Sequence, residues 1–231
     1  LEFRRVLFRS VVSVPFNSTQ TIGVVVSLGP ITSAGLKSIK GLASNYVIPK
    51  NLQELAYVMT RAYVCAPFDI YRFLLPPLSK ASSPINMVKE SESFSNNEKV
   101  DVVVSQIGES VEELLVQRVL RNSSVRRICI VPTYRDVERI STRLRLENID
   151  FAEFGSHLSQ SQRRSAYEEI SKGKTALVLG TRSAIFAPMT AISEIVVINE
   201  GSEHMYEQKS PYWSIREIAK LRNSIEKAQL Y

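Results

Sequence analysis

The second half of the chain alternates short runs of Val and Ile with amphipathic segments, and this order constrains the fold more than any other feature. Strands are predicted at residues 100–104, 127–131, 151–154, 175–179 and 195–198. Helical patterns lie between them, at residues 110–120, 135–147 and 161–171. The alternation predicts a parallel sheet covered by helices on both faces. Such a sheet binds ligands at the carboxyl ends of its strands.

The first part of the chain, residues 11–77, is predicted to be a smaller, β-rich unit. Two β-rich runs, 11–16 and 22–28, flank a polar segment and so favour a hairpin. Residues 36–39 are a candidate short strand, and residues 51–64 are expected to form a helix because their apolar side chains recur on one face.

The stretch between the two units, residues 78–98, is rich in Ser, Asn and charge. Such a composition buries little apolar surface, so we interpret it as a linker. Residues 99–231 then form the second unit.

Residues 1–10 need a separate interpretation. A back-translation of this segment resembles a common sequencing-adapter oligonucleotide, so we interpret it as an artefact, ahead of the alternative of a basic targeting peptide. The formal net charge is +6, and without the three arginines and one glutamate of this leader it is +4. The remaining chain is mildly basic, which by itself is weak evidence for nucleic-acid binding.

The lengths of the apolar stretches and the spacing of Cys and His argue against several function classes. The longest apolar stretches are strand-sized and fall short of the roughly 20 residues that cross a bilayer, so no membrane partner is expected. Cys65 and Cys129 lack metal or redox spacing, which favours a reduced cytosolic setting and no metal site. His157 and His204 have no nearby nucleophile or metal pattern and are interpreted as solvent-facing or structural.

Two loops at the expected ligand-binding edge resemble parts of a nucleotide site. Gly108-Glu109-Ser110 lies between a strand and a helix, as a phosphate-binding loop does, but Glu109 stands where that loop needs a lysine. An ordinary helix start is the alternative, because the helix dipole favours a carboxylate there. Asn199-Glu200 follows a strand at the place where a hydrolase holds magnesium. Asn199 is neutral and binds magnesium weakly, and a plain polar turn is the alternative.

A third loop, Gly180-Thr181-Arg182, also follows a predicted strand. Glycine permits a sharp turn, threonine can cap a helix, and Arg182 is expected to project toward an anion. The basic pairs Arg126-Arg127 and Arg163-Arg164 are by contrast interpreted as solvated faces.

Several segments in the same order resemble the primosomal protein N′ (PriA) family of bacterial replication restart. Those that resemble its first helicase lobe are GTRSAIFAP at 180–188, IVV at 195–197, YEQ at 206–208, and 211–217. Those that resemble its N-terminal domain, which recognises the 3′ end of a nascent strand, are VPF at 14–16, GVVV at 23–26 and LKSI at 36–39. The resemblance runs from Val11 to about Asn223. Residues 132–137 and 201–203 resemble its divergent actinobacterial branch, which lacks intact helicase motifs.

The resemblance implies an α/β chain with a small β-rich N-terminal DNA-binding domain followed by an incomplete RecA-like parallel α/β helicase lobe. It implies a 3′-end pocket at Phe16, Asn17 and Lys37, where the family has glycine in place of Asn17. It places Arg182 either at the nucleotide cleft or on the DNA path. The family's nucleotide site corresponds to five residues here: Gly108, Glu109, Ser110, Asn199 and Glu200.

The departures from the family decide what activity is expected. The Walker A Gly-Lys-Thr corresponds to Gly108-Glu109-Ser110, and the DEEH motif corresponds to 199–202. ATP and magnesium are the family's cofactors, but this site is degenerate, and Glu200 is the one candidate catalytic residue if activity remains. Zinc is expected only in a C-terminal part beyond Tyr231, and the family's winged helix is absent.

We therefore expect a bacterial cytoplasmic, nucleoid-associated protein that binds branched or forked DNA and works with other primosome and replication-restart proteins. It is expected to bind without unwinding. The alternatives are an active ATP-dependent 3′–5′ DNA helicase of the same family and an unrelated two-domain α/β enzyme.

Overall fold

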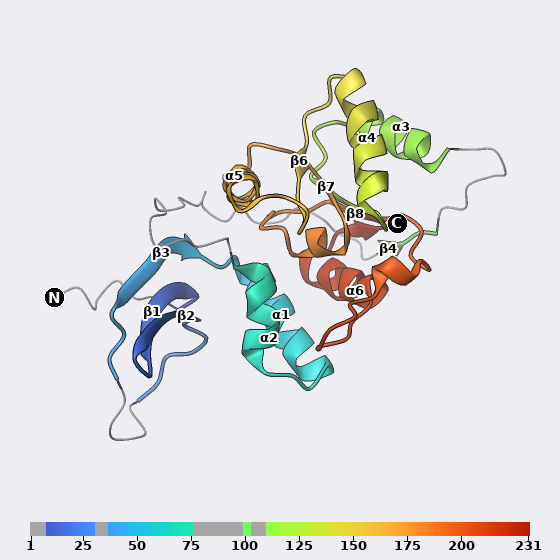
Figure 1. Cartoon of the computed structure of the whole chain (residues 1–231). Coiled ribbons are helices and arrows are strands. Elements are labelled where there is room, and N and C mark those ends of the chain that lie inside the picture. Colours follow the sequence, from blue (N-terminus) through green and yellow to red (C-terminus); the bar gives the residue numbers. More distant parts are fainter. Residues whose placement is uncertain (1–7, 31–36, 76–98, 103–109) are drawn as a thin grey trace.

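A computed structural model describes residues 8–30, 37–75, 99–102 and 110–231 of the chain. Figure 1 shows an antiparallel sheet near the N-terminus, helices beside it, and a parallel sheet flanked by further helices. This arrangement confirms the predicted α/β class, with a β-rich N-terminal part followed by a helix-covered parallel sheet.

The N-terminal sheet has three antiparallel strands in the order β2-β1-β3, namely β1 (Ser10–Phe16), β2 (Thr19–Val24) and β3 (Gly41–Val47). Phe16 pairs with Thr19, so the predicted hairpin is confirmed with a two-residue turn. The second strand begins at Thr19 and ends at Val24, earlier than the run 22–28 suggested. The third strand lies at β3, whereas residues 37–39 are not in a strand and residue 36 lies outside the described residues.

The end of the leader takes part in this sheet. Ser10 pairs with Val47, and the Arg9 guanidinium donates a hydrogen bond to the Ile48 carbonyl oxygen at 3.1 Å. The assignment of residues 1–10 to an artefact stays a prediction.

Two helices follow the N-terminal sheet. Helix α1 (Lys50–Ala62) begins after Pro49 and buries one face, as its apolar spacing predicted, through Leu52, Leu55, Ala56 and Met59. Helix α2 (Pro67–Leu74) starts with proline, which suits the first helical position because its missing N–H has no intrahelical partner there.

The second sheet has six parallel strands in the order β4-β9-β8-β5-β7-β6. The strands are β4 (Lys99–Val100), β5 (Arg127–Ile130), β6 (Ala152–Glu153), β7 (Leu177–Gly180), β8 (Glu194–Val197) and β9 (Gln229–Leu230). The final strand, β9, was not anticipated from the sequence, and it lies between β8 and β4.

Four helices cover this sheet: α3 (Val111–Arg121), α4 (Tyr134–Leu146), α5 (Gln160–Ser171) and α6 (Ile215–Glu226). Helices α4 and α5 begin with capping boxes, built by Thr133 with Asp136 and by Ser159 with Gln162. Two short 3-10 helices, η2 (Arg182–Phe186) and η3 (Glu203–Met205), follow β7 and β8. Helix α6 was not predicted from the sequence.

Successive residues of each parallel strand point to opposite faces of the sheet, so they pack into two different cores. Cys129, Leu179 and Val196 pack under α3 and α4 in one core. Ile128, Val178 and Ile195 belong to a larger core that includes α5 and α6. None of the helices in the described residues is long and apolar enough to cross a membrane.

The larger core also takes in the N-terminal part of the chain. Helix α1 packs against α6, and α2 packs against η2, so both N-terminal helices lie beside the parallel sheet's helices (Figure 1). The Tyr46 ring of β3 meets the Tyr167 ring of α5 edge-on, with centroids 5.1 Å apart. The predicted domain limits within 78–98 fall outside the described residues and stay a prediction.

Candidate nucleic-acid interface

The hairpin turn of the N-terminal sheet brings together the three residues predicted for the 3′-end pocket. Phe16 is 63% exposed at the end of β1. Asn17 follows it with φ of 52°, a left-handed conformation that asparagine tolerates better than most residues. The Lys37 ammonium donates a hydrogen bond to the Asn17 carbonyl oxygen at 3.3 Å. A cation, a turn carbonyl and an exposed ring therefore share one exposed corner.

The predicted phosphate loop is only partly described. Gly108 and Glu109 lie outside the described residues. Ser110 caps α3, where its hydroxyl accepts a hydrogen bond from the Glu113 amide at 3.3 Å and donates one to the Glu112 carboxylate at 2.8 Å. A backbone hydrogen bond and the Ser110 hydroxyl lower the pKa of Glu112. The first turn of α3 thus carries two carboxylates of the chain itself, those of Glu112 and Glu113.

The second predicted part of the nucleotide site lies at the end of β8. Asn199 adopts φ of 53° and its carbonyl oxygen accepts the Ser202 amide at 3.0 Å, so the segment turns sharply away from the strand. The Glu200 carboxylate lies 3.7 Å from the Arg216 guanidinium, and both side chains are largely exposed. Among the described residues, no group of three or more His, Cys, Asp or Glu side chains could hold a metal ion.

Arg182 begins η2, directly after the carboxyl end of β7. Its guanidinium donates a hydrogen bond to the His204 carbonyl oxygen at 3.0 Å and lies 3.5 Å from the Glu207 carboxylate. The preceding Gly180 has an ordinary backbone conformation. The reason for glycine is space, since a Cβ there would lie 1.9 Å from the Phe154 carbonyl oxygen. Thr181 precedes η2 without a capping hydrogen bond from its side chain.

A buried arginine of α6, Arg222, binds the backbone of the loop that follows Arg182. The Arg222 guanidinium donates hydrogen bonds to the carbonyl oxygens of Ile185, Ala187 and Met189. Its Nε lies 3.5 Å from the Glu226 carboxylate, which also accepts a hydrogen bond from Asn51 of α1. Burial lowers the pKa of Arg222 and raises that of Glu226, and their attraction opposes both shifts.

A cleft of about 350 Å³ lies between α2 and the carboxyl ends of β6 and β7. Arg182 lines it together with Arg72 of α2 and Arg163 of α5. Its remaining walls are largely aromatic or hydroxyl-bearing, and they include Phe73, Phe154, Thr181, Ser183, Phe186 and Trp213. The arrangement combines cations with aromatic and hydroxyl-bearing walls.

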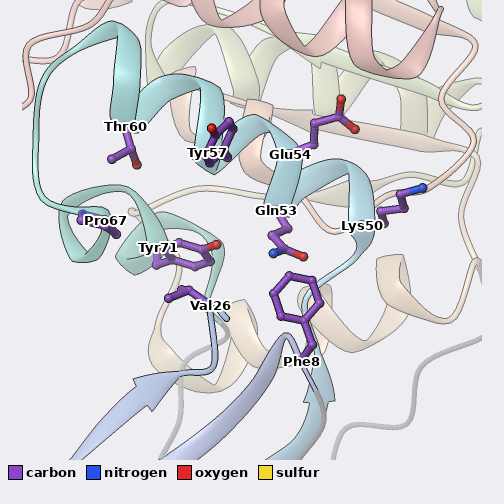
Figure 2. A pocket seen from close by; sticks show the side chains of 9 residues that line it. All are labelled: Phe8, Val26, Lys50, Gln53, Glu54, Tyr57, Thr60, Pro67 and Tyr71. Carbon is purple, nitrogen blue, oxygen red and sulfur yellow. The ribbon is translucent and has the colours of Figure 1, made fainter. Parts of the chain in front are cut away.

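A second hollow, of about 490 Å³, lies where the N-terminal sheet meets α1 and α2. Figure 2 shows Tyr57 and Gln53 of α1 and Tyr71 of α2 around it, with Phe8 and Val26 of the sheet end opposite. The Tyr57 hydroxyl accepts a hydrogen bond from Arg61 at 3.0 Å, which fixes this exposed ring. The hollow lies at the end of the hairpin away from the Asn17 turn, since Val25 pairs with Arg9 and Ser10 there.

The Arg126-Arg127 pair departs from the prediction that the two basic pairs are solvated faces. Arg127 is only 2% exposed, and its Nε lies 2.6 Å from the Glu194 carboxylate. Arg126 donates a hydrogen bond from its Nε to the Thr190 carbonyl oxygen at 2.7 Å. The interpretation of Arg126-Arg127 as a solvated face was therefore wrong, because the strand β5 carries Arg127 into the interior. Arg163 is exposed, but it lines the cleft.

Arg72 and the α6 residues were not predicted from the sequence. Arg72 lies in an apolar run whose helical period was not assigned, and nothing in the sequence alone places it near Arg182. Helix α6 carries a detectable signal, since Ser214 and Glu217 have capping-box spacing before an apolar period of Ile215, Ile218 and Ala219.

Comparison with known proteins gives matches to one family. Residues 4–76 match the family described as the 3′DNA-binding domain (3′BD) of PriA. The chain is 30% identical over 97 residues to the probable replication restart protein PriA of Mycobacterium leprae, which covers 41% of this chain and 15% of that protein. It is 21% identical over 225 residues to the replication restart protein PriA of Helicobacter pylori, covering 90% of this chain and 36% of that protein.

The chain therefore spans well under half the length of these relatives. The matches confirm the resemblance to the PriA family that the motifs indicated. The β-rich N-terminal part, with its hairpin turn, lies within the residues that match the 3′DNA-binding domain of PriA.

Proposed function

We propose that this relative of the PriA replication restart proteins is a DNA-binding protein that recognises stalled or branched replication forks and promotes primosome assembly. In this proposal it acts without helicase activity, together with other primosome and replication-restart proteins, in the bacterial cytoplasm at the nucleoid. The observation that carries the proposal is the corner formed by Phe16, Asn17 and Lys37 within the segment that matches the 3′DNA-binding domain.

The corner has the chemistry that a 3′ terminus requires. Lys37 supplies a positive charge that can pair with the terminal phosphodiester. Its hydrogen bond to Asn17 keeps that charge at the turn, and the exposed Phe16 ring offers a surface on which a base can stack. The remaining N–H groups of the Lys37 ammonium are free to reach a phosphate because lysine has three donors.

Two observations support binding without unwinding. Asn199 supplies a neutral amide where magnesium-dependent hydrolysis uses a carboxylate. The Glu200 carboxylate lies 3.7 Å from the Arg216 guanidinium, so a cation of the chain itself already faces the remaining acid of this turn. No contact in the described residues favours the alternative of an active 3′–5′ helicase. ATP hydrolysis by the complete protein on forked DNA would establish that alternative.

The binding proposal is tested with two fluorescent forks that differ only in a free or phosphate-blocked 3′ end. We expect tighter binding to the free end. Lys37→Ala should weaken that binding by roughly tenfold, the typical effect of one lost charge-assisted hydrogen bond. Lys40→Ala is the matched control, because Lys40 is exposed and lies three residues further along. Equal affinity for the two forks would contradict the assignment of the turn.

A further inference from the structure

Strand β2 forms one edge of the N-terminal sheet. In the order β2-β1-β3, its one neighbour among the described strands is β1. The first four residues of β2, 19–22, are exposed. The edge of a sheet presents a row of backbone N–H and C=O groups that can pair with a strand from another molecule.

The pairing with β1 determines which backbone groups of β2 face this edge. In an antiparallel pair, hydrogen-bonded and non-hydrogen-bonded residue pairs alternate along the strands. Gln20 lies opposite Pro15, which has no N–H to donate, so Gln20 belongs to the non-hydrogen-bonded set. The Val25 amide donates a hydrogen bond to the Ser10 carbonyl oxygen at 3.0 Å, which places the odd-numbered residues in the other set. The residues whose N–H and C=O groups face the free edge are therefore Gln20, Ile22 and Val24.

This edge lacks the features that normally keep sheet edges apart. Native proteins protect their edges with charged side chains, prolines or bulges. Residues 17–29 contain neither a charged residue nor a proline, and β2 pairs with β1 without a shift of register. Three apolar side chains of this segment are exposed, namely Ile22 at 37%, Val26 at 45% and Leu28 at 70%. Exposed apolar surface of this kind indicates an interaction surface.

The absence of charge indicates which partner fits the edge. Two copies of a chain with a net charge of +6 repel each other as a whole. An uncharged strand can pair with its own copy because no like charges come to lie opposite each other. Lys37 is hydrogen-bonded to Asn17 at the hairpin turn. If two β2 strands pair antiparallel, the two turns lie at opposite ends, which keeps these lysines apart.

We propose that two copies of this chain associate through β2, as an antiparallel pair of strands related by a two-fold axis. The outward-facing groups select the register, since only pairing centred on Ile22 uses all three of them in both copies. Ile22 then lies opposite the partner's Ile22, and Gln20 lies opposite the partner's Val24. The sheets of the two copies become one continuous sheet.

The proposed contact is small, so the association is expected to be weak. The paired strand has six residues in each copy. Interfaces below about 1,200 Å² are typical of transient association. We therefore expect a monomer–dimer equilibrium that shifts between about 1 μM and 1 mM protein. Added salt should strengthen it, because salt screens the repulsion between two basic chains and leaves the backbone hydrogen bonds in place.

Cysteine cross-linking of the whole chain tests the register. Opposite residues in a hydrogen-bonded antiparallel pair have Cα atoms about 5.5 Å apart, a separation that a disulfide can span. Ile22→Cys should therefore form a covalent dimer on mild oxidation. Gln20→Cys is the matched control, since it is exposed on the same strand and its two copies would lie roughly 14 Å apart. The wild-type chain gives the background from Cys65 and Cys129.

Sedimentation velocity over a series of protein concentrations tests the edge itself. Ile22→Lys places two like charges opposite each other, so the dimer should be lost. Thr142→Lys adds the same charge at an exposed position of α4 and should leave the dimer unchanged. The melting temperature of both variants should stay near that of the wild type, because both positions are exposed.

A wild-type chain that stays monomeric up to about 1 mM would overturn the proposal. Cross-linking of Gln20→Cys as efficient as that of Ile22→Cys would contradict the register, and a dimer that persists in Ile22→Lys would exclude β2 as the contact. None of these results bears on the 3′-end corner, whose binding to forks is measured at protein concentrations where the chain is monomeric.

Discussion

Asn51 of α1 and Glu226 of α6 lie 175 residues apart in the chain and are joined by a hydrogen bond from the amide to the carboxylate. The same carboxylate lies beside Arg222, which binds three carbonyl oxygens of the loop that carries Arg182. One chain of polar contacts therefore connects the N-terminal helices, the last long helix and the loop that carries Arg182.

This connection predicts a stability effect for Asn51→Ala. Removal of the amide leaves a buried carboxylate with one partner fewer, so the free energy of unfolding should fall by about 1–3 kcal/mol. Glu54→Ala is the control, because Glu54 is exposed on the same helix. Urea unfolding monitored by circular dichroism measures both. A loss in Glu54→Ala as large as that in Asn51→Ala would assign the effect to α1 itself.

Gly180→Ala should be strongly destabilising, because its Cβ would lie 1.9 Å from the Phe154 carbonyl oxygen. Backbone atoms of β6 and β7 must then separate, at a cost of about 1–3 kcal/mol or more. Gly201→Ala serves as control, since a Cβ there meets nothing within 4 Å. The melting temperature of Gly201→Ala should stay near the wild type, and that of Gly180→Ala should drop by several degrees.

The two cysteines should react very differently with alkylating reagents. Burial raises the pKa of the Cys129 thiol to about 12, and the thiolate is the reactive form. Cys65 is half-buried, and burial together with Asp69 raises its pKa as well, so it should react slowly but measurably near pH 8. Mass spectrometry after iodoacetamide treatment should find Cys65 labelled and Cys129 protected until denaturant is added. Equal labelling in the native protein would refute the buried placement of Cys129.

Glu194 makes a contribution to stability that depends on pH. Burial works to raise the pKa of its carboxyl group, but Arg127 and Arg118 outweigh burial through hydrogen bonds and charge and lower that pKa below the usual 4.5. A lowered pKa in the folded state stabilises the fold above the usual carboxyl pKa. That stability is lost as the pH falls through the folded value.

Glu194→Gln should therefore cost about 3–5 kcal/mol near pH 7, because it leaves the buried Arg127 without a counter-charge. The difference between variant and wild type should shrink as the pH is lowered from about 5 toward 3. Denaturant titrations over this range measure it. A difference that stays constant with pH would show that packing, and not ionisation, supplies the contribution of Glu194.

The sequence predicted most of the parallel sheet, because buried strands and amphipathic helices leave strong local patterns. The apolar spacing of residues 51–64 predicted α1, whose buried face includes Leu52, Leu55 and Met59. The position of Arg127 was misjudged for a physical reason. A basic pair looks solvated in a sequence, and only the partner at Glu194, 67 residues away, allows one of its members to be buried.

The candidate sites were predictable to differing degrees. The corner of Asn17 and Lys37 was predicted from family resemblance, and the structure brings the two residues together. The cleft was not predicted beyond Arg182, because Arg72 reaches it only through the packing of α2 on η2. Contacts between segments so distant in the chain have no local signature.

The placement of β9 bears on the order in which the chain folds. Because β9 lies between β8 and β4, the strand β4 has no native neighbour in the described sheet until residues 229–230 have joined it. The Gln229 amide also donates a hydrogen bond to Asp101 at 2.6 Å across 128 residues. Such distant pairings are slow to form because a large loop must close first. Strand β4 comes first in the sequence among the strands of the parallel sheet, yet it is among the last to be hydrogen-bonded. In pulse-labelling hydrogen exchange, the amides around Val100 should therefore gain protection after those of β5.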